Sequence, residues 1–406
     1  MSIDIQSIRK DFPILEHQVY GKPYIYFDSA ATALRPVQVL NAVTKIYNEF
    51  NGNPHRGSHY MSNQTTLAYE EVRDKVQQFI NAPSREEIIF TKGATEGINL
   101  VAYSFGDAFI SEGDEIIITE MEHHANIVPW QLLAQRKKAR IKVLPITDKG
   151  ELIVSELDNL ITAKTKLLAL NMVSNVLGTV NPIQDIIEKA HSKDVKVLID
   201  AAQGIQHIKT DVHKLDCDFL VFSGHKIYGP TGVGCLYGKR ELLDAMPPFL
   251  SGGEMIEKVS FDGTTFNSLP YKFEAGTPNF TEVVGMGAAL DYVNDIGLDT
   301  IADYEHELLE YATSELKQID GMRILGEAEN KASVISFLVG KAHPYDMGMF
   351  LDKMGFAVRT GHHCAEPLMD RFEIPGTVRI SLAIYNTKDE IDKLVQAIVK
   401  VAGMLQ

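Results

Sequence analysis

The sequence predicts an α/β protein with a large domain built on a mainly parallel sheet, followed by a smaller α+β domain. Two observations support this fold class. Up to about residue 275, short apolar runs alternate with amphipathic helical segments, and this alternation requires crossover connections between parallel strands. From residue 276 onwards, a long helical stretch gives way to shorter strands and a last helix.

Each expected strand of the large domain is a short, mostly apolar run, as is typical of sheets covered by helices on both faces. The strands are expected at YIYFD (24–28), EIIFT (87–91), EIIIT (115–119), KLLALNMV (166–173), KVLID (196–200) and DFLVFS (218–223). Between them, apolar residues recur at helical spacing. The helices are expected at 35–50, 66–80, 126–139 and 183–193.

The pattern changes after GTPNFTEVVGMGAALDYVNDIG (276–297). A helical stretch continues to about residue 318, and a last helix starts near residue 387. The strands between them are expected at SVISFLV (333–339), FAVRT (356–360) and VRISLAI (378–384). The predicted division is an N-terminal arm at 1–20, a large domain at 21–280 and a smaller domain at 281–406.

Charge and composition exclude several classes of function. The formal net charge is −15 over 406 residues, which argues against nucleic acid or an anionic membrane surface as the main partner. The three cysteines are far apart without a CxxC pair, so the usual zinc spacings are missing and a reducing compartment is indicated. The N-terminus does not read as a signal peptide, and no apolar run is long enough to span a bilayer. We therefore expect a cytoplasmic protein without a membrane or nucleic-acid partner.

Polar residues follow several expected strands where each strand ends. Asp200 ends KVLID, Lys226 follows DFLVFS, His123 follows EIIIT, and Asn175 follows LLALNMV. In open α/β sheets, ligands bind outside the carboxyl ends of the strands. Each residue alone is more often structural, but together they predict one shared site at this edge.

Lys226 is the centre of the predicted site. It stands in FSGHKIYGPTG (222–232), where a surface lysine in a turn is the simpler interpretation. The alternative is a Schiff-base lysine, because a confined amine can condense with an aldehyde cofactor. Pyridoxal phosphate also needs an acid opposite its ring nitrogen. Asp200 can supply that acid, although the same residue can cap a helix.

The cofactor phosphate needs a cradle, and TKGATEGINL (91–100) is the candidate. A strand ends, Gly93 turns the chain, and Thr95 stands where a helix begins. Backbone N–H groups and the helix dipole at such a terminus bind phosphate. Threonine is also a common N-cap, so this motif is weak alone. Ser223 and His225, which flank the lysine, can add further donors.

Cys364 decides which reaction the sequence favours. It lies in RTGHHC beside two histidines and Arg359, a cationic setting that favours the reactive thiolate. Cys217 and Cys235 lie in or beside expected strands and are interpreted as buried apolar residues. The paired histidines do not indicate a metal, because no further ligand stands at the required spacing.

Several motifs together resemble one family, the group II cysteine desulfurases, which are fold-type I pyridoxal-phosphate enzymes. The resemblance runs from YFDSAATALRP (26–36) to YNTKDEIDKLV (385–395). The other motifs are GATEGINLVA, MEHHANIVPW, SNVLGT, IDAAQG, SGHKIYGPTGVG, EAGTPN and RTGHHCAEPL. One variation is Ala94, where many relatives have threonine.

The resemblance implies a role for each matching residue. Lys226 would hold the cofactor and move the Cα proton, and Cys364 would accept sulfur from L-cysteine as a persulfide. The implied cofactor contacts are Asp200 to the ring nitrogen, Gln203 to the ring hydroxyl, His123 stacked on the ring, and Thr95, Ser223, His225 and a second subunit's Thr277 around the phosphate. The implied substrate contacts are Asn175 and Arg379 to the carboxylate, with Arg359, His55 and Arg56 at the border of the site.

The same resemblance implies alanine as the product and sulfur supply to iron–sulfur cluster assembly. It also implies a homodimer and a small sulfur-acceptor protein, SufE-like or SufU-like. His343 is either a capping residue or a contact for that acceptor. Three alternatives stay open at this point: selenocysteine lyase chemistry on the same site, an aminotransferase, and a non-catalytic scaffold.

Overall fold

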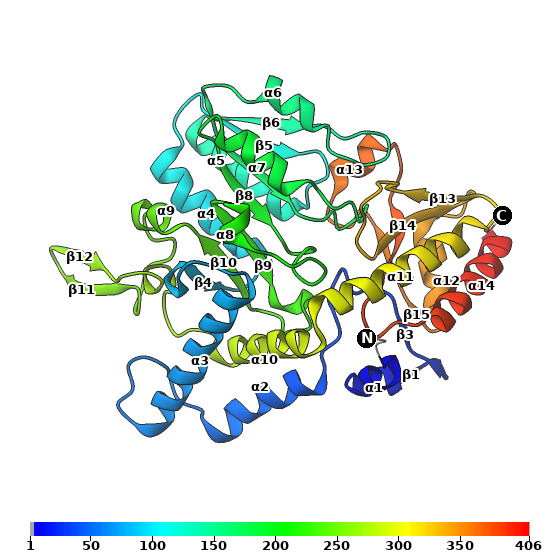
Figure 1. Cartoon of the computed structure of the whole chain (residues 1–406), viewed down its shortest axis with the longest axis horizontal. Helices are drawn as coiled ribbons and strands as arrows, with labels where there is room; N and C mark the ends of the chain where they lie inside the picture. Colours follow the sequence, from blue (N-terminus) through cyan, green and yellow to red (C-terminus); the bar gives the residue numbers. More distant parts are fainter. Residues whose placement is uncertain (1–3, 406) are drawn as a thin grey trace.

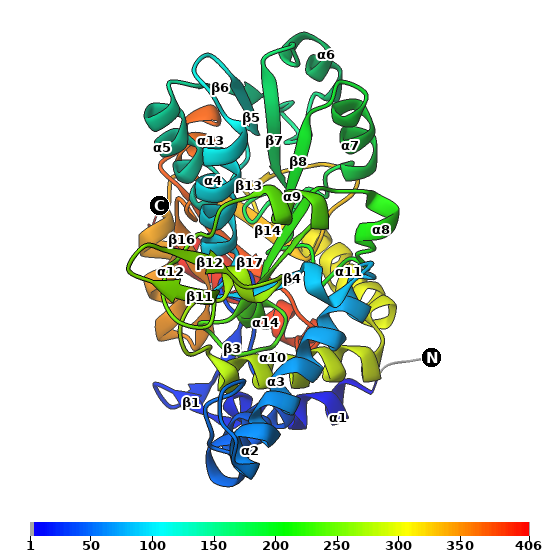
Figure 2. The same cartoon turned by 90° about the vertical axis from the view of Figure 1, so that its left-hand side faces the viewer.

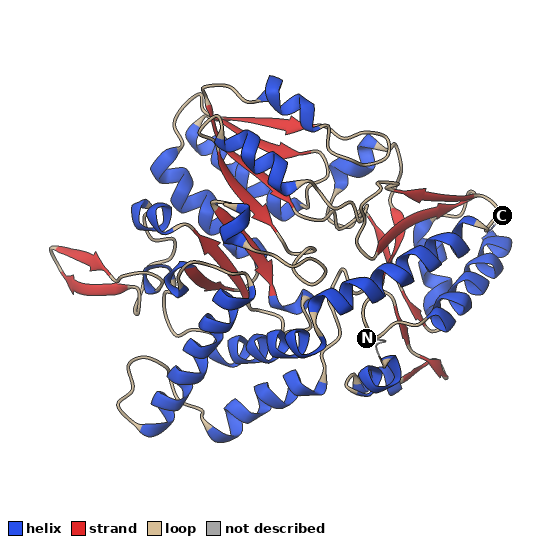
Figure 3. Cartoon of the chain, in the orientation of Figure 1, coloured by secondary structure: helices blue, strands red, loops and turns tan. Residues whose placement is uncertain are grey.

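The centre of the protein is a seven-stranded sheet of order β4-β10-β9-β8-β7-β5-β6, seen in a computed structural model that describes residues 4–405. β10 runs antiparallel to both of its neighbours, and the other four pairs are parallel, so the prediction of a mainly parallel sheet is confirmed. The strands are β4 (Ile88–Thr91), β5 (Glu115–Thr119), β6 (Arg140–Leu144), β7 (Thr165–Asn171), β8 (Lys196–Asp200), β9 (Phe219–Ser223) and β10 (Gly234–Gly238). Figure 3 shows these strands enclosed by helices.

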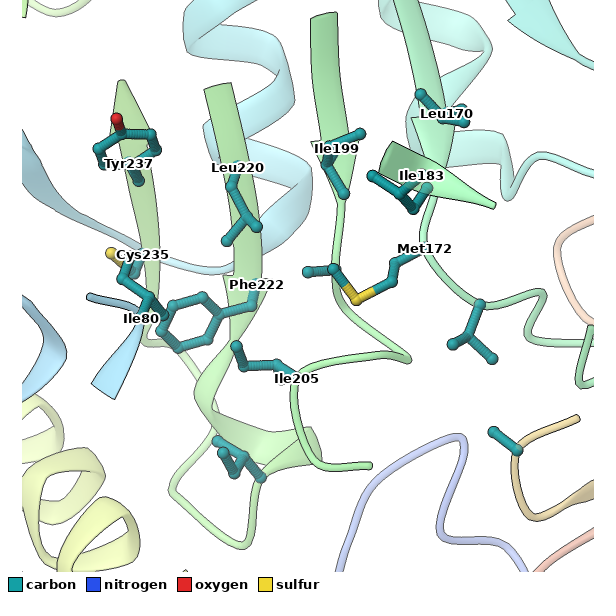
Figure 4. Close-up of a cluster of buried hydrophobic side chains, with 14 of the residues drawn as sticks. Ile80, Leu170, Met172, Ile183, Ile199, Ile205, Leu220, Phe222, Cys235 and Tyr237 are labelled. Atoms are coloured by element: carbon teal, nitrogen blue, oxygen red, sulfur yellow. The ribbon is translucent and has the colours of Figure 1, made fainter. Parts of the chain in front are cut away.

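The central strands are apolar because both faces of the sheet are buried. Successive residues of a strand point to opposite faces, and in β5 the side chain of Ile117 joins one core cluster while Ile116 and Ile118 join the other. Figure 4 shows part of the first cluster, where Leu220 and Phe222 of β9 point to the same side as Ile199 of β8. Burial on both sides explains why these strands have no alternating polar pattern.

Helices cover each face with the apolar stripes that their spacing predicts. On one face lie α4 (Ala94–Phe109) and α5 (Val128–Lys137), which pack against each other. The other face is covered by α3 (Tyr60–Phe79), α7 (Ile183–His191) and α10 (Phe280–Ile296), and α10 also packs against α2 (Val37–Glu49) (Figure 1). Three short helices complete this part: α6 (Leu157–Leu160), α8 (Val212–Leu215) and α9 (Arg240–Ala245).

The C-terminal part has its own antiparallel sheet of order β13-β14-β17-β16 and its own core cluster. Its strands are β13 (Met322–Leu325), β14 (Val334–Val339), β16 (Arg359–Gly361) and β17 (Thr377–Ser381). Its helices are α11 (Leu298–Lys317), α12 (Pro344–Lys353), α13 (Glu366–Arg371) and α14 (Lys388–Leu405). This confirms the expected change to a smaller α+β unit.

Two segments lie differently from the expected division of the chain. The strand expected at 24–28 is β3 (Ile25–Tyr26), and it pairs in parallel with β15 (Phe356–Ala357) rather than with the large sheet. Ile25 and Phe27 are buried in the C-terminal core cluster. Conversely, all but the first residue of α10 lies within 281–406, yet the helix packs on α2 and α3 of the large domain (Figure 1). An apolar strand pattern carries no information about a partner more than 300 residues away.

The N-terminal arm bridges the two parts. It contains α1 (Ile5–Lys10) and β1 (Gln18–Val19), which forms a small hairpin with β2 (Lys22–Pro23) just after the arm. Arg9 forms an ion pair of 2.8 Å with Glu390 of α14, and Asp11 accepts a hydrogen bond of 3.0 Å from Tyr292 of α10. A second hairpin, β11 (Ile256–Ser260) with β12 (Gly263–Phe266), projects from the large domain (Figures 1 and 2). No described helix combines the length and the apolar character needed to cross a membrane.

Candidate active site

A cavity of about 310 Å³ opens at the carboxyl ends of the central strands, between the two parts of the chain. The C-terminal part contributes Arg359, Cys364 and Arg379 to its lining. The sequence-predicted residues of the large domain that line it are Thr95, His123, Asn175, Asp200, Gln203, Ser223, His225 and Lys226. The structure therefore brings together most of the side chains that the strand-end argument and the resemblance selected.

Lys226 lies in a single 3₁₀ turn (Gly224–Lys226) directly after β9, and Asp200 is the last residue of the neighbouring strand β8. Burial lowers the pKa of the Lys226 amine to about 8, although the carboxylate of Asp200 opposes this shift. Burial also raises the pKa of Asp200, whose Oδ1 accepts a hydrogen bond of 2.9 Å from the backbone N–H of Ala202. The pair provides a nucleophilic amine above a buried acid.

His123 and Gln203, which line the same cavity, are each held by a contact with the backbone. Nδ1 of His123 accepts a hydrogen bond of 3.0 Å from the N–H of Ala125, which caps the 3₁₀ turn at His124–Asn126. Burial and then the charge of Lys226 lower the pKa of His123 to about 4, so the ring is neutral near pH 7. Gln203 donates from Nε2 to the carbonyl of Ala30 at 2.6 Å.

The start of α4 forms one end of the cavity. Gly93, with φ of 148°, is its N-cap, and the backbone approaches β10 so closely that a Cβ at Gly234 would come within 2.5 Å of the Gly93 Cα. Ala94 donates its N–H to Oγ of Ser223 at 2.9 Å. Across from it, burial lowers the pKa of His225 to about 4. The first turn of α4, with its N–H groups and helix dipole, lies here beside the hydroxyl of Ser223, and such a terminus binds an anion.

Two arginines of the C-terminal part also line the cavity. Arg379 of β17 is almost fully buried and donates from Nη1 to the carbonyl of Asn175 at 2.9 Å. Its Nη2 lies 3.4 Å from a carboxylate oxygen of Asp28, and Nη2 of Arg359 lies 2.9 Å from the other. Sequence reasoning did not select Asp28, although its place at the end of the YIYFD run was a usable signal.

Cys364 is exposed at the edge of this cavity, on the loop between β16 and α13. The loop backbone is fixed, because the carbonyl of Cys364 accepts from the N–H of His124 at 2.7 Å and the carbonyl of His363 accepts from Asn175 at 2.7 Å. His363 and Cys364 both have positive φ, 53° and 55°. Such a conformation is uncommon outside glycine and persists where contacts impose it.

One part of the expected cationic setting is wrong. Burial lowers the pKa of His363 to about 3, and the charge of Arg379 adds to the shift, so His363 is neutral at pH 7. The positive charges that line the cavity together with Cys364 are therefore guanidinium groups and the amine of Lys226. The other two cysteines, Cys217 and Cys235, are fully buried, and this burial raises the pKa of both thiols.

Three predicted residues do not line the cavity of their own chain. His55 pairs with Glu70 at 3.0 Å, and Arg56 pairs with Glu254 at 2.7 Å. Their predicted place at the border of the substrate site stays a prediction. Thr277 is exposed, and its role toward a second subunit stays a prediction.

His343 caps α12, since its Nδ1 accepts from the N–H of Tyr345 at 3.3 Å. The capping alternative for this residue is therefore confirmed. In the described part of the chain, no group of three or more His, Cys, Asp or Glu side chains is arranged to hold a metal ion.

Unpaired polar atoms indicate what the cavity is built to hold. Within residues 4–405, four buried atoms of its lining have no hydrogen-bond partner. They are Oδ1 of Asn175, Nδ1 of His225, Nδ1 of His363 and Nε of Arg379. Buried polar atoms rarely stay unpaired unless a ligand or water completes them. Among them, the Nε–H of Arg379 is a donor suited to an anionic oxygen of a ligand, and Oδ1 of Asn175 is an acceptor suited to a ligand N–H or O–H.

The model of the aminotransferase class-V family matches residues 25–394. The chain belongs to the aminotransferase class-V family. A cysteine desulfurase of Serratia proteamaculans (strain 568) is 52% identical over 406 residues, with both chains fully covered. The crystal structure of the cysteine desulfurase CsdA from Escherichia coli superposes with a TM-score of 0.93 at 40% identity, with all of both chains covered.

The apo structure of a cysteine desulfurase from Thermococcus onnurineus NA1 gives a TM-score of 0.94 at 38% identity, covering 100% of this chain and 99% of that one. These similarities confirm the fold-type I assignment. Pyridoxal phosphate is the cofactor of such class-V enzymes, and the donor set of the cavity fits it. The amine of Lys226, the acid of Asp200 and the anion site at the start of α4 are the three parts that this cofactor needs.

Proposed function

We propose that this class-V chain is a pyridoxal-phosphate-dependent cysteine desulfurase, which converts L-cysteine to L-alanine and leaves the sulfur on Cys364 as a persulfide. One observation supports the proposal above the others. The exposed thiol of Cys364 and the buried amine of Lys226 line the same cavity. An aminotransferase needs only the amine. The names of the similar proteins point to the same activity and do not favour selenocysteine lyase chemistry.

In this proposal, residues of the chain itself bind the substrate and move its Cα proton. Arg379 binds the substrate carboxylate, because its free Nε–H adds a second donor to a guanidinium already anchored on Asn175. Lys226 takes the Cα proton, and a pKa of about 8 suits an amine that alternates between both protonation states. The bound cofactor would supply an electron sink for the carbanion formed when that proton leaves.

Sulfur transfer then balances without an external oxidant. The thiolate of Cys364 attacks the substrate sulfur, forming an S–S bond while the substrate's Cβ–S bond breaks. The electron pair of the broken bond returns to the substrate carbon, which takes up a proton and becomes the methyl group of alanine. The fixed backbone of the Cys364 loop supports this role, because a positioned nucleophile loses little entropy on reaching its target.

The remaining proposals concern partners. The persulfide at the exposed Cys364 is available to a small acceptor protein, SufE-like or SufU-like, that passes sulfur to iron–sulfur cluster assembly in the cytoplasm. A homodimer is supported by Thr277, which does not line its own cavity and is exposed for contact with a second copy. His55 and Arg56 belong to the same proposal, since they too lie outside the cavity of their own chain.

The test is alanine formation from L-cysteine under reducing conditions in wild type, Cys364→Ala and the matched control Cys235→Ala. We expect alanine from wild type and from the control, and almost none from Cys364→Ala. Equal rates in all three would show that Cys364 is not the sulfur acceptor. A keto acid instead of alanine would indicate an aminotransferase, and a protein that stays colourless with added pyridoxal phosphate would indicate a scaffold.

A further inference from the structure

Asp28 lies between the two arginines of the cavity and touches both. Its carboxylate is 2.9 Å from Nη2 of Arg359 and 3.4 Å from Nη2 of Arg379. The backbone of Asp28, two residues after the end of β3, is fixed, since it bridges to Ser381 and its carbonyl accepts from the N–H of Ala31 at 3.0 Å. The carboxylate is therefore held in place, and it acts on the cavity through Arg359 and Arg379, which line it.

The charges of the group formed by Arg359, Arg379 and Asp28 can be counted. Arg379 has 4% of its side chain exposed and Asp28 has 14%, whereas Arg359 is half exposed. Because burial lowers the pKa of His363 to about 3, that ring adds no charge at pH 7. Two guanidinium groups and one carboxylate leave one net positive charge. That charge matches a single carboxylate of a ligand.

The hydrogen-bonding groups of Arg379 also indicate a single ligand carboxylate. Nη1 and Nη2 of Arg379 each have one partner, Asn175 and Asp28, whereas its Nε has none among the described residues. A buried charge is stable only when it is paired and hydrogen-bonded. Asp28 thus permanently supplies the negative charge that a second ligand carboxylate would otherwise bring to the guanidinium groups.

We propose that Asp28 is a positioning residue that sets the charge selectivity of the substrate site, so that acids with one carboxylate are accepted and dicarboxylic acids are disfavoured. The inference rests on the proposed function, in which Arg379 binds the carboxylate of the substrate. Asp28 acts through the two arginines. It repels a second carboxylate and holds both guanidinium groups in place.

The test compares two four-carbon acids, butyrate with one carboxylate and succinate with two, neither of which has an amine. Their dissociation constants on the holoenzyme are measured by competition against L-alanine, whose binding is followed by the absorbance of the bound cofactor. The variants are Asp28→Asn, which removes the charge, and Asp28→Glu, which keeps it. The matched control is Asp148→Asn, which removes a carboxylate from Arg371, paired at 2.7 Å outside the cavity.

In wild type, we expect butyrate to bind at least as tightly as succinate. In Asp28→Asn, the preference should shift toward succinate by about tenfold, because one negative charge beside two guanidinium groups is lost in a partly buried site. Asp28→Glu and Asp148→Asn should keep the wild-type ratio. For L-cysteine, Asp28→Asn should change KM more than kcat.

Two results would overturn the inference. One is an unchanged ratio of the two constants in Asp28→Asn, and the other is a wild type that already prefers succinate. An equal shift in Asp28→Asn and Asp28→Glu would also overturn it, because only geometry would then matter. The competition assay needs no turnover, so a wild type that makes no alanine would refute the proposed function while leaving this measurement readable.

Discussion

The amine of Lys226 should titrate far below an ordinary lysine, and the structure fixes the size of the effect. Burial lowers its pKa from 10.5 to about 8. At pH 7 the neutral amine is then about 10% of the population, against about 0.03% for an ordinary lysine, a gain of roughly 300-fold in nucleophile. Replacing Asp200 by Asn removes the charge that opposes the shift, so the pKa should fall further, by about one unit.

The assay is competitive labelling of the protein freed of cofactor with an amine-selective acylating reagent, with Lys226 quantified by mass spectrometry across pH. A lysine peptide in the same sample serves as the reference. We expect the labelling of Lys226 to reach half its maximum near pH 8, and below pH 8 in Asp200→Asn. Restricted access slows the labelling but does not move the midpoint. A midpoint that coincides with the peptide's would refute the reasoning, as would a rise in Asp200→Asn.

Three further predictions concern binding and stability. Arg379→Lys should lower kcat/KM for L-cysteine by about thirtyfold, mainly by raising KM. The point charge of lysine replaces a guanidinium that binds the carboxylate through two donors, and the binding free energy lost is about 2 kcal/mol. Steady-state kinetics tests this. Glu274→Gln should destabilise the protein by about 3 kcal/mol, because Arg73 is fully buried and its ion pair of 2.7 Å with Glu274 would be broken; a lowered unfolding temperature is the measurement. Gly97→Val should also lower that temperature, because even a Cβ at this position comes within 2.8 Å of Val221.

The strand-end residues could be predicted because a parallel sheet turns sequence order into spatial proximity. KVLID and DFLVFS are apolar runs long enough to be strands, and adjacent parallel strands place Asp200 and the turn with Lys226 at one edge. The roles of Gln203 and Arg379 had no such signal. They were available only through the resemblance, since neither the strand pattern nor the charge of a single arginine indicates a carboxylate site.

What the sequence could not indicate depends on contacts between distant segments. The apolar run at 24–28 is a good strand, but its partner β15 lies more than 300 residues later, and this pairing places Asp28 beside Arg379. The protonation state of His363 likewise depends on a contact that the sequence does not indicate. Its neighbours in the sequence suggest a charged ring, whereas burial against Arg379 makes it neutral. The arginine pair is therefore set by how the C-terminal part docks on the first 28 residues, whereas the Cys364 loop is held by His124 and Asn175 of the large domain. Activity should accordingly respond to substitutions at the β3–β15 contact even though no residue there touches the substrate.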